Sequence, residues 1–341
     1  MGNGSKVYFD GDVDLSVLKN KTIAVIGYGN QGRAHALNFR DSGLGVIVGN
    51  IKDAYWEMAE EDGFKVHTID KAVELGDIVC IFIPDELQPE VYQRMIESKL
   101  SPGKALVFAS GFNIHFGFIE PPEFVDVGME APRMIGVGVR DRFVKGLGFP
   151  TLIAVQQDAS GRAKEIVLAL AKAVGATRVG AFESSFEEEV VLDTFSEQGC
   201  FAGLYALFQA QFEILVEAGY NPALVVLELW KSGEIIEEIK AWVDTGFFKQ
   251  MGFHSTTSQY GSMTRGPRIV TEETRKTLRR HLEEIQSGIF AREWMVEQRS
   301  GCPVFRMLKK NCLNHRINEV EERLDNILRT KKVGASSDPE I

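Results

Sequence analysis

The sequence is poor in cysteine and has no excess of positive charge, and each shortage excludes a class of protein. Its 341 residues include only four cysteines, Cys80, Cys200, Cys302 and Cys312, which form neither a CxxC motif nor a paired framework. This pattern argues against a disulfide scaffold and favours reduced thiols in the cytoplasm. The net charge of −10 argues against nucleic acid or an anionic membrane surface as a general partner.

Long uninterrupted apolar runs are also missing. The most apolar helical stretch, residues 201–218, is interrupted by Gln209, Gln211 and Glu213. We therefore expect a buried helix there and not a membrane span, and the start of the chain has no signal-peptide pattern. The length suits two domains with separate cores, and a composition of 44% hydrophobic and 25% charged residues is typical of a soluble protein.

A glycine-rich segment follows a short apolar run and precedes a helical pattern. Residues 23–26 are apolar and predict a buried strand, and Gly27, Gly29 and Gly32 follow as a GxGxxG motif. In dinucleotide-binding folds these glycines allow a tight turn, a close approach to the pyrophosphate and close packing of helix on strand. Glycine turns also serve purely structural roles, but the strand before the motif and the helix after it favour a nucleotide site.

Further apolar segments alternate with helical patterns through the first half of the chain. The expected strands are residues 46–48, 66–69, 78–83, 106–108, 125–127 and 152–155. This alternation predicts an α/β fold with a doubly wound, parallel Rossmann sheet over residues 1–181. Because ligands bind at the carboxyl ends of such strands, we expect Pro84, Asp85, Ser110 and Arg133 to lie at the site.

Asn50, Lys52 and Asp53 follow the second expected strand, whose end meets the adenosine ribose in this fold. The Asp53 carboxylate suits the 2′ and 3′ hydroxyls and would repel a 2′-phosphate, whereas Lys52 would attract one. A second interpretation is that Asp53 simply caps a helix that begins near residue 54.

The pattern becomes helical over residues 182–328, and residues 329–341 read as a polar tail. Asp193 and Glu197 are four residues apart, so both carboxylates project from one face of a helix. Such a pair suits Mg²⁺, although a solvated acidic face explains the same spacing. Glu228 and Glu234 are six apart, and surface ion pairs are the simpler interpretation for them.

Six motifs in one order then give the chain a resemblance to a known family. They are 26–38 (IGYGNQGRAHALN), 84–88 (PDELQ), 111–116 (GFNIHF), 157–161 (QDASG), 192–198 (LDTFSEQ) and 216–220 (VEAGY). With them the sequence resembles the short class of ketol-acid reductoisomerases from about residue 7 to residue 328. The resemblance implies a Rossmann domain followed by an all-helical, knotted domain.

The family binds two magnesium ions and a reduced nicotinamide, and it isomerises and then reduces a 2-acetohydroxy acid in branched-chain amino acid synthesis. By position, the resemblance implies metal ligands at Asp193, Glu197 and one of Glu228 and Glu234. We favour Glu234, as both ligand and catalytic residue, and Ser255 as the substrate-binding serine. The cofactor-binding residues that we expect are Gly27, Tyr28, Gly29, Gln31, Gly32, Asn50, Asp53, Pro84, Asp85 and Gly136.

Two departures from the family pattern fall on catalytic positions. Ser110 stands in place of the family histidine, and Arg133 in place of the family lysine. Arginine does not release its proton near neutral pH, but both side chains can donate hydrogen bonds to a developing oxyanion. His115 is no substitute, since the family has a histidine there too. Three hypotheses remain: the full isomeroreductase, a reductase acting on 2-keto acids without alkyl migration, and an inactive nucleotide-binding protein.

The remaining expectations concern the cofactor and the assembly. The short 50–53 loop lacks the arginine and serines that hold a 2′-phosphate in NADPH-using members, so we expect NADH to be preferred over NADPH. The resemblance implies a homodimer or higher oligomer formed through the helical domain. The apolar residues 201–215 suit such an interface, and they fit an ordinary core equally well.

Overall fold

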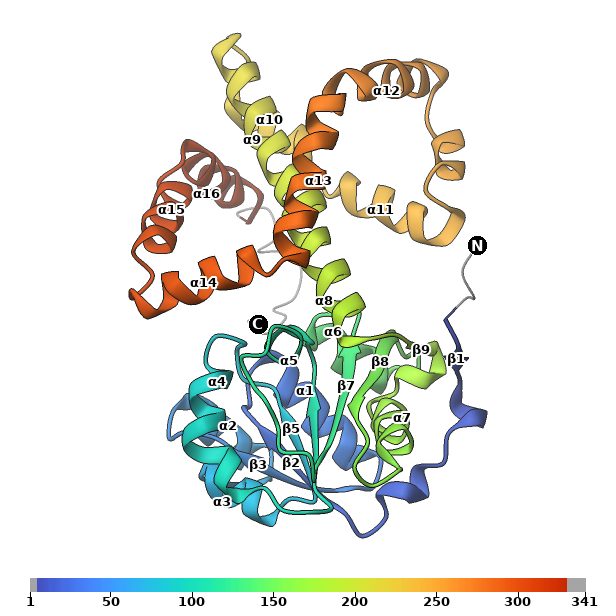
Figure 1. The fold of residues 1–341 in the computed structure, drawn as a ribbon. Helices are drawn as coiled ribbons and strands as arrows, with labels where there is room; N and C mark the ends of the chain where they lie inside the picture. The colour runs from blue at the N-terminus through green and yellow to red at the C-terminus, as the bar shows by residue number, and fades with distance from the viewer. Residues whose placement is uncertain (1–4, 330–341) are drawn as a thin grey trace. The chain divides into compact units, whose positions relative to one another are not determined.

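The computed structural model describes residues 5–329, which form two compact units divided after Asp193 (Figure 1). The first unit is built on a mixed sheet, and the second consists of helices. The predicted tail of 329–341 lies outside the described residues, apart from Arg329 at the end of the last helix. The predicted α/β class is confirmed, and the predicted knot stays a prediction.

The first unit contains one nine-stranded sheet in the order β1-β9-β8-β7-β6-β5-β2-β3-β4. The strands are β1 (Val7–Tyr8), β2 (Thr22–Ile26), β3 (Gly45–Gly49), β4 (Lys65–His67), β5 (Ile78–Ile81), β6 (Ala105–Phe108), β7 (Asp126–Pro132), β8 (Pro150–Gln157) and β9 (Gly180–Glu183). From β2 the chain winds one way through β3 to β4 and the other way through β5 and β6 to β7, always in parallel. This doubly wound part matches the expected Rossmann sheet.

Two strand pairs are antiparallel, so the sheet is not parallel throughout as the alternation of segments predicted. β8 pairs antiparallel with β7, and β1 pairs antiparallel with β9. Pro132 at the end of β7 lies opposite Thr151 near the start of β8, because the chain between them leaves and returns at the same edge. β9 was not predicted, and Ile69, expected in a strand, begins α3.

The central strands are buried on both faces because helices cover each side. Along β2, Ile23 and Val25 join one apolar cluster, while Ala24 and Ile26 join the other. The helical segments of this unit are α1 (Asn30–Asp41), α2 (Ala54–Glu61), α3 (Ile69–Leu75), α4 (Gln88–Val91), α5 (Phe112–His115), α6 (Gly136–Val144), α7 (Ala163–Val174) and α8 (Phe186–Phe195), with short turns at Asp10–Asp12, Leu15–Leu18, Tyr92–Ile96, Glu97–Lys99 and Ala176–Arg178. Helices α1, α6 and α7 pack on the first cluster, and α3 packs on the second.

The second unit is all helical, as predicted. Its segments are α9 (Ala202–Glu217), α10 (Pro222–Val226), α11 (Glu234–Thr245), α12 (Thr256–Ile269), α13 (Glu272–Gln286), α14 (Ile289–Arg299), α15 (Pro303–Leu313) and α16 (Arg316–Arg329), with tighter or wider turns at Ser196–Phe201, Leu227–Lys231 and Lys249–Phe253. A small core joins α9, α10 and α16 around Phe212, Val226 and Leu324.

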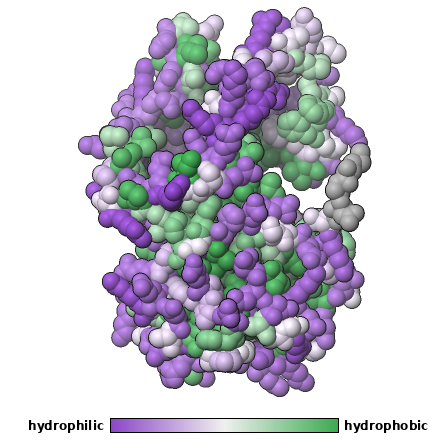
Figure 2. Space-filling view, in the orientation of Figure 1, coloured by the Kyte–Doolittle hydropathy of each residue, from purple (hydrophilic) through white to green (hydrophobic). Residues whose placement is uncertain are grey.

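The apolar helix at the start of this unit is exposed, so the expectation that it is a buried helix was wrong. Within α9 the only buried residue is Phe212, while Tyr205 and Ile214 are exposed. The continuous helix Phe186–Glu217 is long and apolar enough to cross a membrane by length and composition alone, with 6% of its apolar window buried. Hydrophobic side chains are visible on the surface of the helical unit in Figure 2.

Candidate active site

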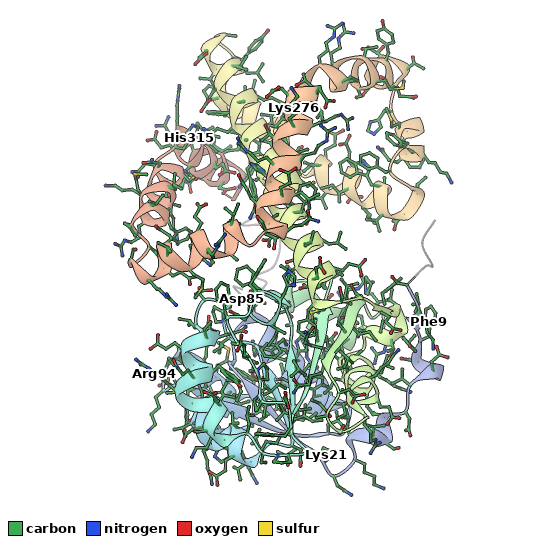
Figure 3. The ribbon with its side chains drawn as sticks, viewed as in Figure 1. Phe9, Lys21, Asp85, Arg94, Lys276 and His315 are labelled. Atoms are coloured by element: carbon green, nitrogen blue, oxygen red, sulfur yellow. The ribbon has the colours of Figure 1, made fainter. Side chains whose placement is uncertain are left out.

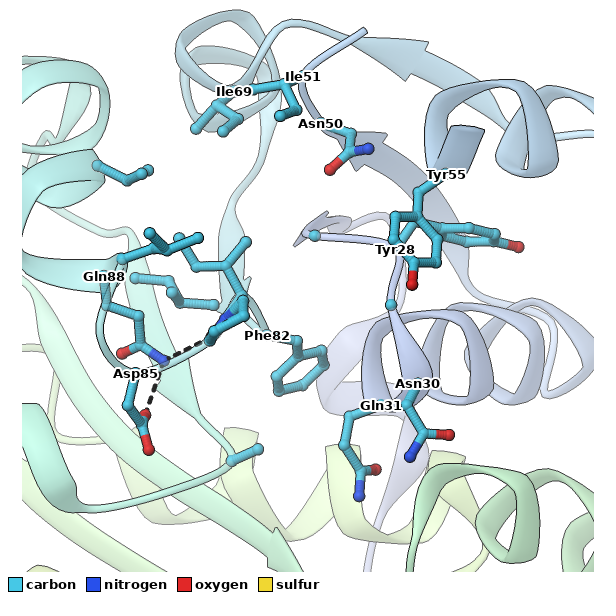
Figure 4. A pocket seen from close by; sticks show the side chains of 18 of the residues that line it. Tyr28, Asn30, Gln31, Asn50, Ile51, Tyr55, Ile69, Phe82, Asp85 and Gln88 are labelled. Atoms are coloured by element: carbon cyan, nitrogen blue, oxygen red, sulfur yellow. Dashed lines mark hydrogen bonds between the residues drawn. The ribbon is translucent and has the colours of Figure 1, made fainter. Parts of the chain in front are cut away.

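The carboxyl ends of the parallel strands meet around a cavity of about 790 Å³ in the first unit (Figure 4). Its lining includes Gly27, Tyr28, Gly29, Asn30 and Gln31 after β2, Asn50, Ile51 and Asp53 after β3, Ile83, Pro84 and Asp85 after β5, Ala109 and Ser110 after β6, and Pro132 at the end of β7. The winding direction changes between β2 and β5, which is where ligands bind in open α/β sheets. A volume of this size suits a small-molecule ligand.

The glycine-rich turn brings backbone to the cavity wall. Gly27 has φ +92°, a left-handed conformation that glycine adopts without strain. A Cβ on Gly32 would lie 2.1 Å from the carbonyl oxygen of Gly27, so only glycine lets α1 begin this close to the turn. Gln31 is in the first turn of α1, and its side-chain amide donates to the Met134 carbonyl at 3.0 Å. These contacts fit the roles expected of the motif.

Asp53 caps α2, as one of the two interpretations predicted. Its Oδ1 atom accepts from the backbone N–H groups of Tyr55 and Trp56 at 3.0 Å each, and from the Asn50 amide at 2.9 Å. Asp53 also lines the cavity, so the cap does not exclude a contact with ribose. The Lys52 ammonium lies 5.9 Å from the centre of the Trp56 ring.

A buried amide network fixes the turn that carries Asp85. Gln88 donates to the Ile83 carbonyl at 2.9 Å and to the Asp85 carboxylate at 3.0 Å (Figure 4). Asn113, 1% exposed, donates to the Asp85 carbonyl at 2.9 Å and to the Gln88 side chain at 3.0 Å. Figure 3 shows Asp85 at the carboxyl edge of the sheet and Lys21 near the opposite edge.

Arg133 joins two carboxylates of α8 at this same edge. Its Nη2 donates to Glu189 at 2.7 Å and its Nη1 to Asp193 at 3.0 Å. Glu189, with its side chain 1% exposed, also accepts from the Gly111 backbone N–H at 2.8 Å. The Asp193 side chain is 49% exposed. A fixed positive charge is thus held between one buried and one accessible carboxylate.

Burial raises the pKa of two carboxyl groups at this edge, those of Asp85 and Glu189. It raises the pKa of Asp85 to about 7, with smaller contributions from the charges of Glu189, Glu86 and Asp193, against a lowering hydrogen bond from Ser110. Burial also raises the pKa of Glu189, against the Gly111 N–H and the Arg133 charge. Asp85 keeps partial contact with the cavity, so water there limits how far its pKa rises.

Glu189 is a residue that the sequence analysis missed. It is the last of three consecutive acids, Glu187 to Glu189, a run that is typical of a solvated face, but it is nearly inaccessible and binds the expected catalytic Arg133. Its spacing held the signal, because Glu189, Asp193 and Glu197 recur every four residues along one helical stretch.

Two expected cofactor residues have other contacts. Tyr28 is 1% exposed, and its hydroxyl donates to Asp62 at 2.8 Å, although the residue lines the cavity. Gly136 does not line the cavity; a Cβ there would lie 2.1 Å from the Asn30 carbonyl oxygen, so it allows α6 to approach the glycine-rich turn. Their roles in cofactor binding stay predictions.

The remaining expected site residues belong to the helical unit. Glu197 lies in the wide turn Ser196–Phe201, Glu228 in Leu227–Lys231, and the exposed Glu234 begins α11. Ser255 caps α12 by accepting from the Ser258 N–H at 3.2 Å. Within residues 5–329, three or more histidine, cysteine or acidic side chains do not gather as a metal site would require. Carboxylate oxygens match the ligand preference of Mg²⁺, so the donor chemistry of Asp193 and Glu197 fits that ion.

A doubly wound sheet with a glycine-rich turn at its switch point defines the class of dinucleotide-binding Rossmann proteins. Residues 17–180 match the acetohydroxy acid isomeroreductase NADPH-binding domain, and residues 186–330 match the ketol-acid reductoisomerase C-terminal domain. The chain belongs to the ketol-acid reductoisomerase family, which are NAD(P)H-dependent oxidoreductases.

Solved structures agree with this assignment. An NADH-preferring ketol-acid reductoisomerase from an uncultured archean is 39% identical with a TM-score of 0.90, over 97% of this chain and 100% of that one. A putative oxidoreductase from Jannaschia sp. CCS1 is 16% identical with a TM-score of 0.59, over 79% and 97%. An NAD-binding semialdehyde dehydrogenase protein from Cupriavidus necator is 16% identical with a TM-score of 0.57, over 76% and 99%. The last two share the fold alone.

The raised pKa of Asp85 predicts a distinct pH dependence of stability. Between about pH 4 and pH 7 the folded protein keeps a proton on Asp85 that the unfolded chain has lost, so this carboxyl makes the free energy of unfolding fall as pH rises. Asp85→Asn removes the titration and should flatten the decline of Tm between pH 5 and pH 7, measured by calorimetry on ligand-free protein. Glu61→Gln, at an exposed carboxyl, should leave the decline unchanged. An identical slope in Asp85→Asn and the unaltered protein would contradict the assignment.

Proposed function

We propose that this chain is a magnesium-dependent ketol-acid reductoisomerase that converts a 2-acetohydroxy acid to a 2,3-dihydroxy acid. The observation that carries the proposal is the grouping of Ser110, Arg133 and Glu189 at the carboxyl edge, beside the nucleotide cavity. The family membership supplies the reaction class. In this reaction an alkyl group migrates within the substrate, and hydride from the nicotinamide then reduces the new ketone.

The residues at this edge suit the orientation and charge stabilisation that both steps need. Arg133 presents a permanent positive charge, and Ser110 presents a hydroxyl that can donate to a developing oxyanion. Magnesium, when bound, acidifies a coordinated hydroxyl and polarises the adjacent carbonyl. The nicotinamide carries the hydride chemistry, so the protein has to supply position. Glu234 and Ser255 remain our proposed catalytic and substrate-binding residues of the helical unit.

A second candidate is a reductase that acts on the 2-keto acid without alkyl migration. The replacement of the family histidine and lysine by Ser110 and Arg133 favours it, since neither side chain exchanges a proton near neutral pH. An inactive nucleotide-binding protein is the third candidate. The retention of Asp193, Glu197 and Ser255 at the family's metal- and substrate-ligand positions disfavours it, because a nucleotide sensor needs neither metal nor substrate.

Two substrates separate these candidates. We expect the purified protein, with saturating Mg²⁺ and NADH, to consume both 2-acetolactate and the 2-keto-3-hydroxy intermediate, because magnesium and the nicotinamide supply most of the chemistry of the two steps. Absorbance at 340 nm measures each rate. Reduction of the intermediate without consumption of 2-acetolactate would establish the reductase-only alternative, and no consumption of either would leave nucleotide binding alone.

Asp53 supports a preference for NADH over NADPH. A 2′-phosphate beside a carboxylate on the cavity wall would meet like charge, whereas ribose hydroxyls would meet an acceptor. The 39%-identical structure is of an NADH-preferring enzyme, which supports the same preference here.

Asp53→Ser should shift this preference. Serine keeps a capping oxygen for α2 and removes the negative charge, so the ratio of kcat/KM for NADPH to that for NADH should rise about tenfold, equivalent to ~1.4 kcal/mol. Glu57→Gln, an exposed acid in the first turn of the same helix, is the matched control and should leave the ratio unchanged. A higher kcat/KM for NADPH in the unaltered protein would contradict the preference itself.

Asp193 and Glu197 are our proposed magnesium ligands, with Glu234 as a further one. The support is their donor chemistry and their place along one continuous helix. Arg133 engages one oxygen of Asp193 and leaves the second carboxylate oxygen for other ligands.

Asp193→Asn tests this assignment. The amide keeps the shape of the side chain and removes its charge. Because the loss of a residue that only supports a metal ligand lowers activity by up to about 100-fold, the loss of a direct ligand should lower turnover at least 100-fold. NADH affinity, measured by fluorescence, should stay within twofold, and Mg²⁺ binding by calorimetry should weaken. Glu187→Gln, at an exposed acid of the same helix, controls for the lost charge. Equal losses of turnover and NADH affinity would assign Asp193 to structure.

We further propose a cytoplasmic homodimer or higher homo-oligomer, with domain boundaries at 1–181 and 182–328. The large hydrophobic side chains exposed on the helical unit support self-association, among them Tyr205, Val243, Phe248 and Phe253. The net charge of −10 supports the absence of nucleic-acid and membrane partners. Light scattering on purified protein measures the mass directly.

A further inference from the structure

A buried acid and a buried histidine lie directly behind the wall of the nucleotide cavity. Glu130 on β7 is 1% exposed and His35 on α1 is 0% exposed, and their Oε2 and Nε2 atoms are 3.0 Å apart. Thr151 on β8 donates to the other Glu130 oxygen at 2.7 Å. The His35 ring lies 4.4 Å from that of Phe82, which lines the cavity. Neither Glu130 nor His35 has been given a role in the site so far.

The hydrogen-bond partners determine how many protons the pair carries. His35 Nδ1 lies 2.8 Å from the Gln31 carbonyl oxygen, which can only accept, so Nδ1 carries a hydrogen. A second proton must lie between Nε2 and Oε2, because two lone pairs would otherwise face each other at 3.0 Å. The pair is therefore electrically neutral as a unit, which permits its burial.

These hydrogen bonds and the backbone between them form a closed ring of links that includes two expected site residues, Gln31 and Arg133. From Glu130 the backbone follows β7 to its end at Pro132 and continues through Arg133 to Met134, whose carbonyl accepts from the Gln31 side chain at 3.0 Å. One helical turn links Gln31 to His35, and His35 returns to Glu130. The ring thus connects the first turn of the dinucleotide helix to the strand end that carries Arg133.

We propose that Glu130 and His35 are positioning residues that hold Gln31 at the cofactor and Arg133 at the reacting groups in a fixed relation. The proposal rests on the proposed function for its kinetic half, and on nucleotide binding alone for its cofactor half. Misplacement by about 1 Å can cost a reaction roughly 100-fold, so a rigid link between these two groups has a direct effect on rate.

Another buried acid on β7 provides the matched control. Asp126, 3% exposed, accepts from the Ser160 backbone at 2.8 Å and from its hydroxyl at 2.6 Å. It lies at the amino end of β7, at the sheet edge away from the cavity. Asp126→Asn therefore disturbs a buried acid of the same strand without touching the ring.

Three variants separate positioning from simple core stability. Glu130→Leu leaves His35 Nε2 without a partner, and the double variant His35→Leu, Glu130→Leu replaces the whole pair by apolar side chains. Glu130→Gln keeps every contact, since its amide can donate to His35 and its oxygen can accept from Thr151. Melting temperature, NADH affinity by fluorescence, and kcat and KM for 2-acetolactate are measured for each.

We expect both leucine variants to lose kcat at least tenfold and to bind NADH more weakly, even where the double variant recovers the melting temperature. Glu130→Gln should stay within about threefold of the unaltered protein, and Asp126→Asn should change melting temperature alone. Leucine variants with unaltered kcat and NADH affinity, or losses matched by Asp126→Asn, would overturn the proposal. So would the failure of both leucine variants to fold, which would assign the pair to the core.

The outcome is separable from that of the proposed function. If the unaltered protein turns over neither 2-acetolactate nor the keto acid, the proposed function fails. The NADH affinities of Glu130→Leu and Glu130→Gln can still be measured and compared. A selective loss of affinity in Glu130→Leu then supports positioning, and equal affinities contradict it.

Discussion

The parallel pairing of β2 with both β3 and β5 is the constraint on which the rest of the first unit depends. It places three strand ends at one edge and leaves a cavity where the chain changes its winding direction. The polar groups that these three strands bring to the cavity follow the strand ends: the glycine turn follows β2, Asp53 follows β3, and Asp85 follows β5. Helix packing secures this edge, because Gly32 lets α1 begin within van der Waals distance of the turn.

The sequence predicted this edge well because its signals are local. Period, glycine spacing and strand-end polarity are properties of short segments, so they predicted the glycine turn, Asp85 and Ser110 in the cavity wall and gave the Asp53 cap as one of two interpretations. The strand β8 was predicted, but its antiparallel direction was missed, because the direction depends on the path of the chain between β7 and β8 and not on the residues of the strand. The exposure of α9 was also missed, because an apolar composition predicts burial but does not show which other segment of the protein covers the helix. Glu189 was missed because its partner Arg133 lies 56 residues away.

Arg133, which replaces the family lysine, forms ion pairs with two carboxylates, those of Glu189 and Asp193. A guanidinium has donors in a fixed planar fork, and here its two terminal nitrogens reach Glu189 and Asp193. Glu189 is nearly inaccessible, and an isolated carboxylate there would be costly. The arginine charge and the Gly111 N–H offset part of that cost, and burial still raises the pKa of Glu189. Arginine thus organises this edge electrostatically, as a planar cation rather than as a proton donor.

Of the side chains named at this edge, the Asp85 carboxyl is the one whose pKa lies near neutral pH. Arg133 keeps its charge and Ser110 keeps its hydroxyl hydrogen throughout the neutral range. Asp85, whose pKa burial raises to about 7, changes its protonation within that range. Its position is fixed by Gln88 and Asn113, which are themselves buried, so the group that titrates is also one that cannot easily move. A ligand that excludes water from the cavity would raise the pKa of Asp85 further, and a cation bound near Asp193 would lower it.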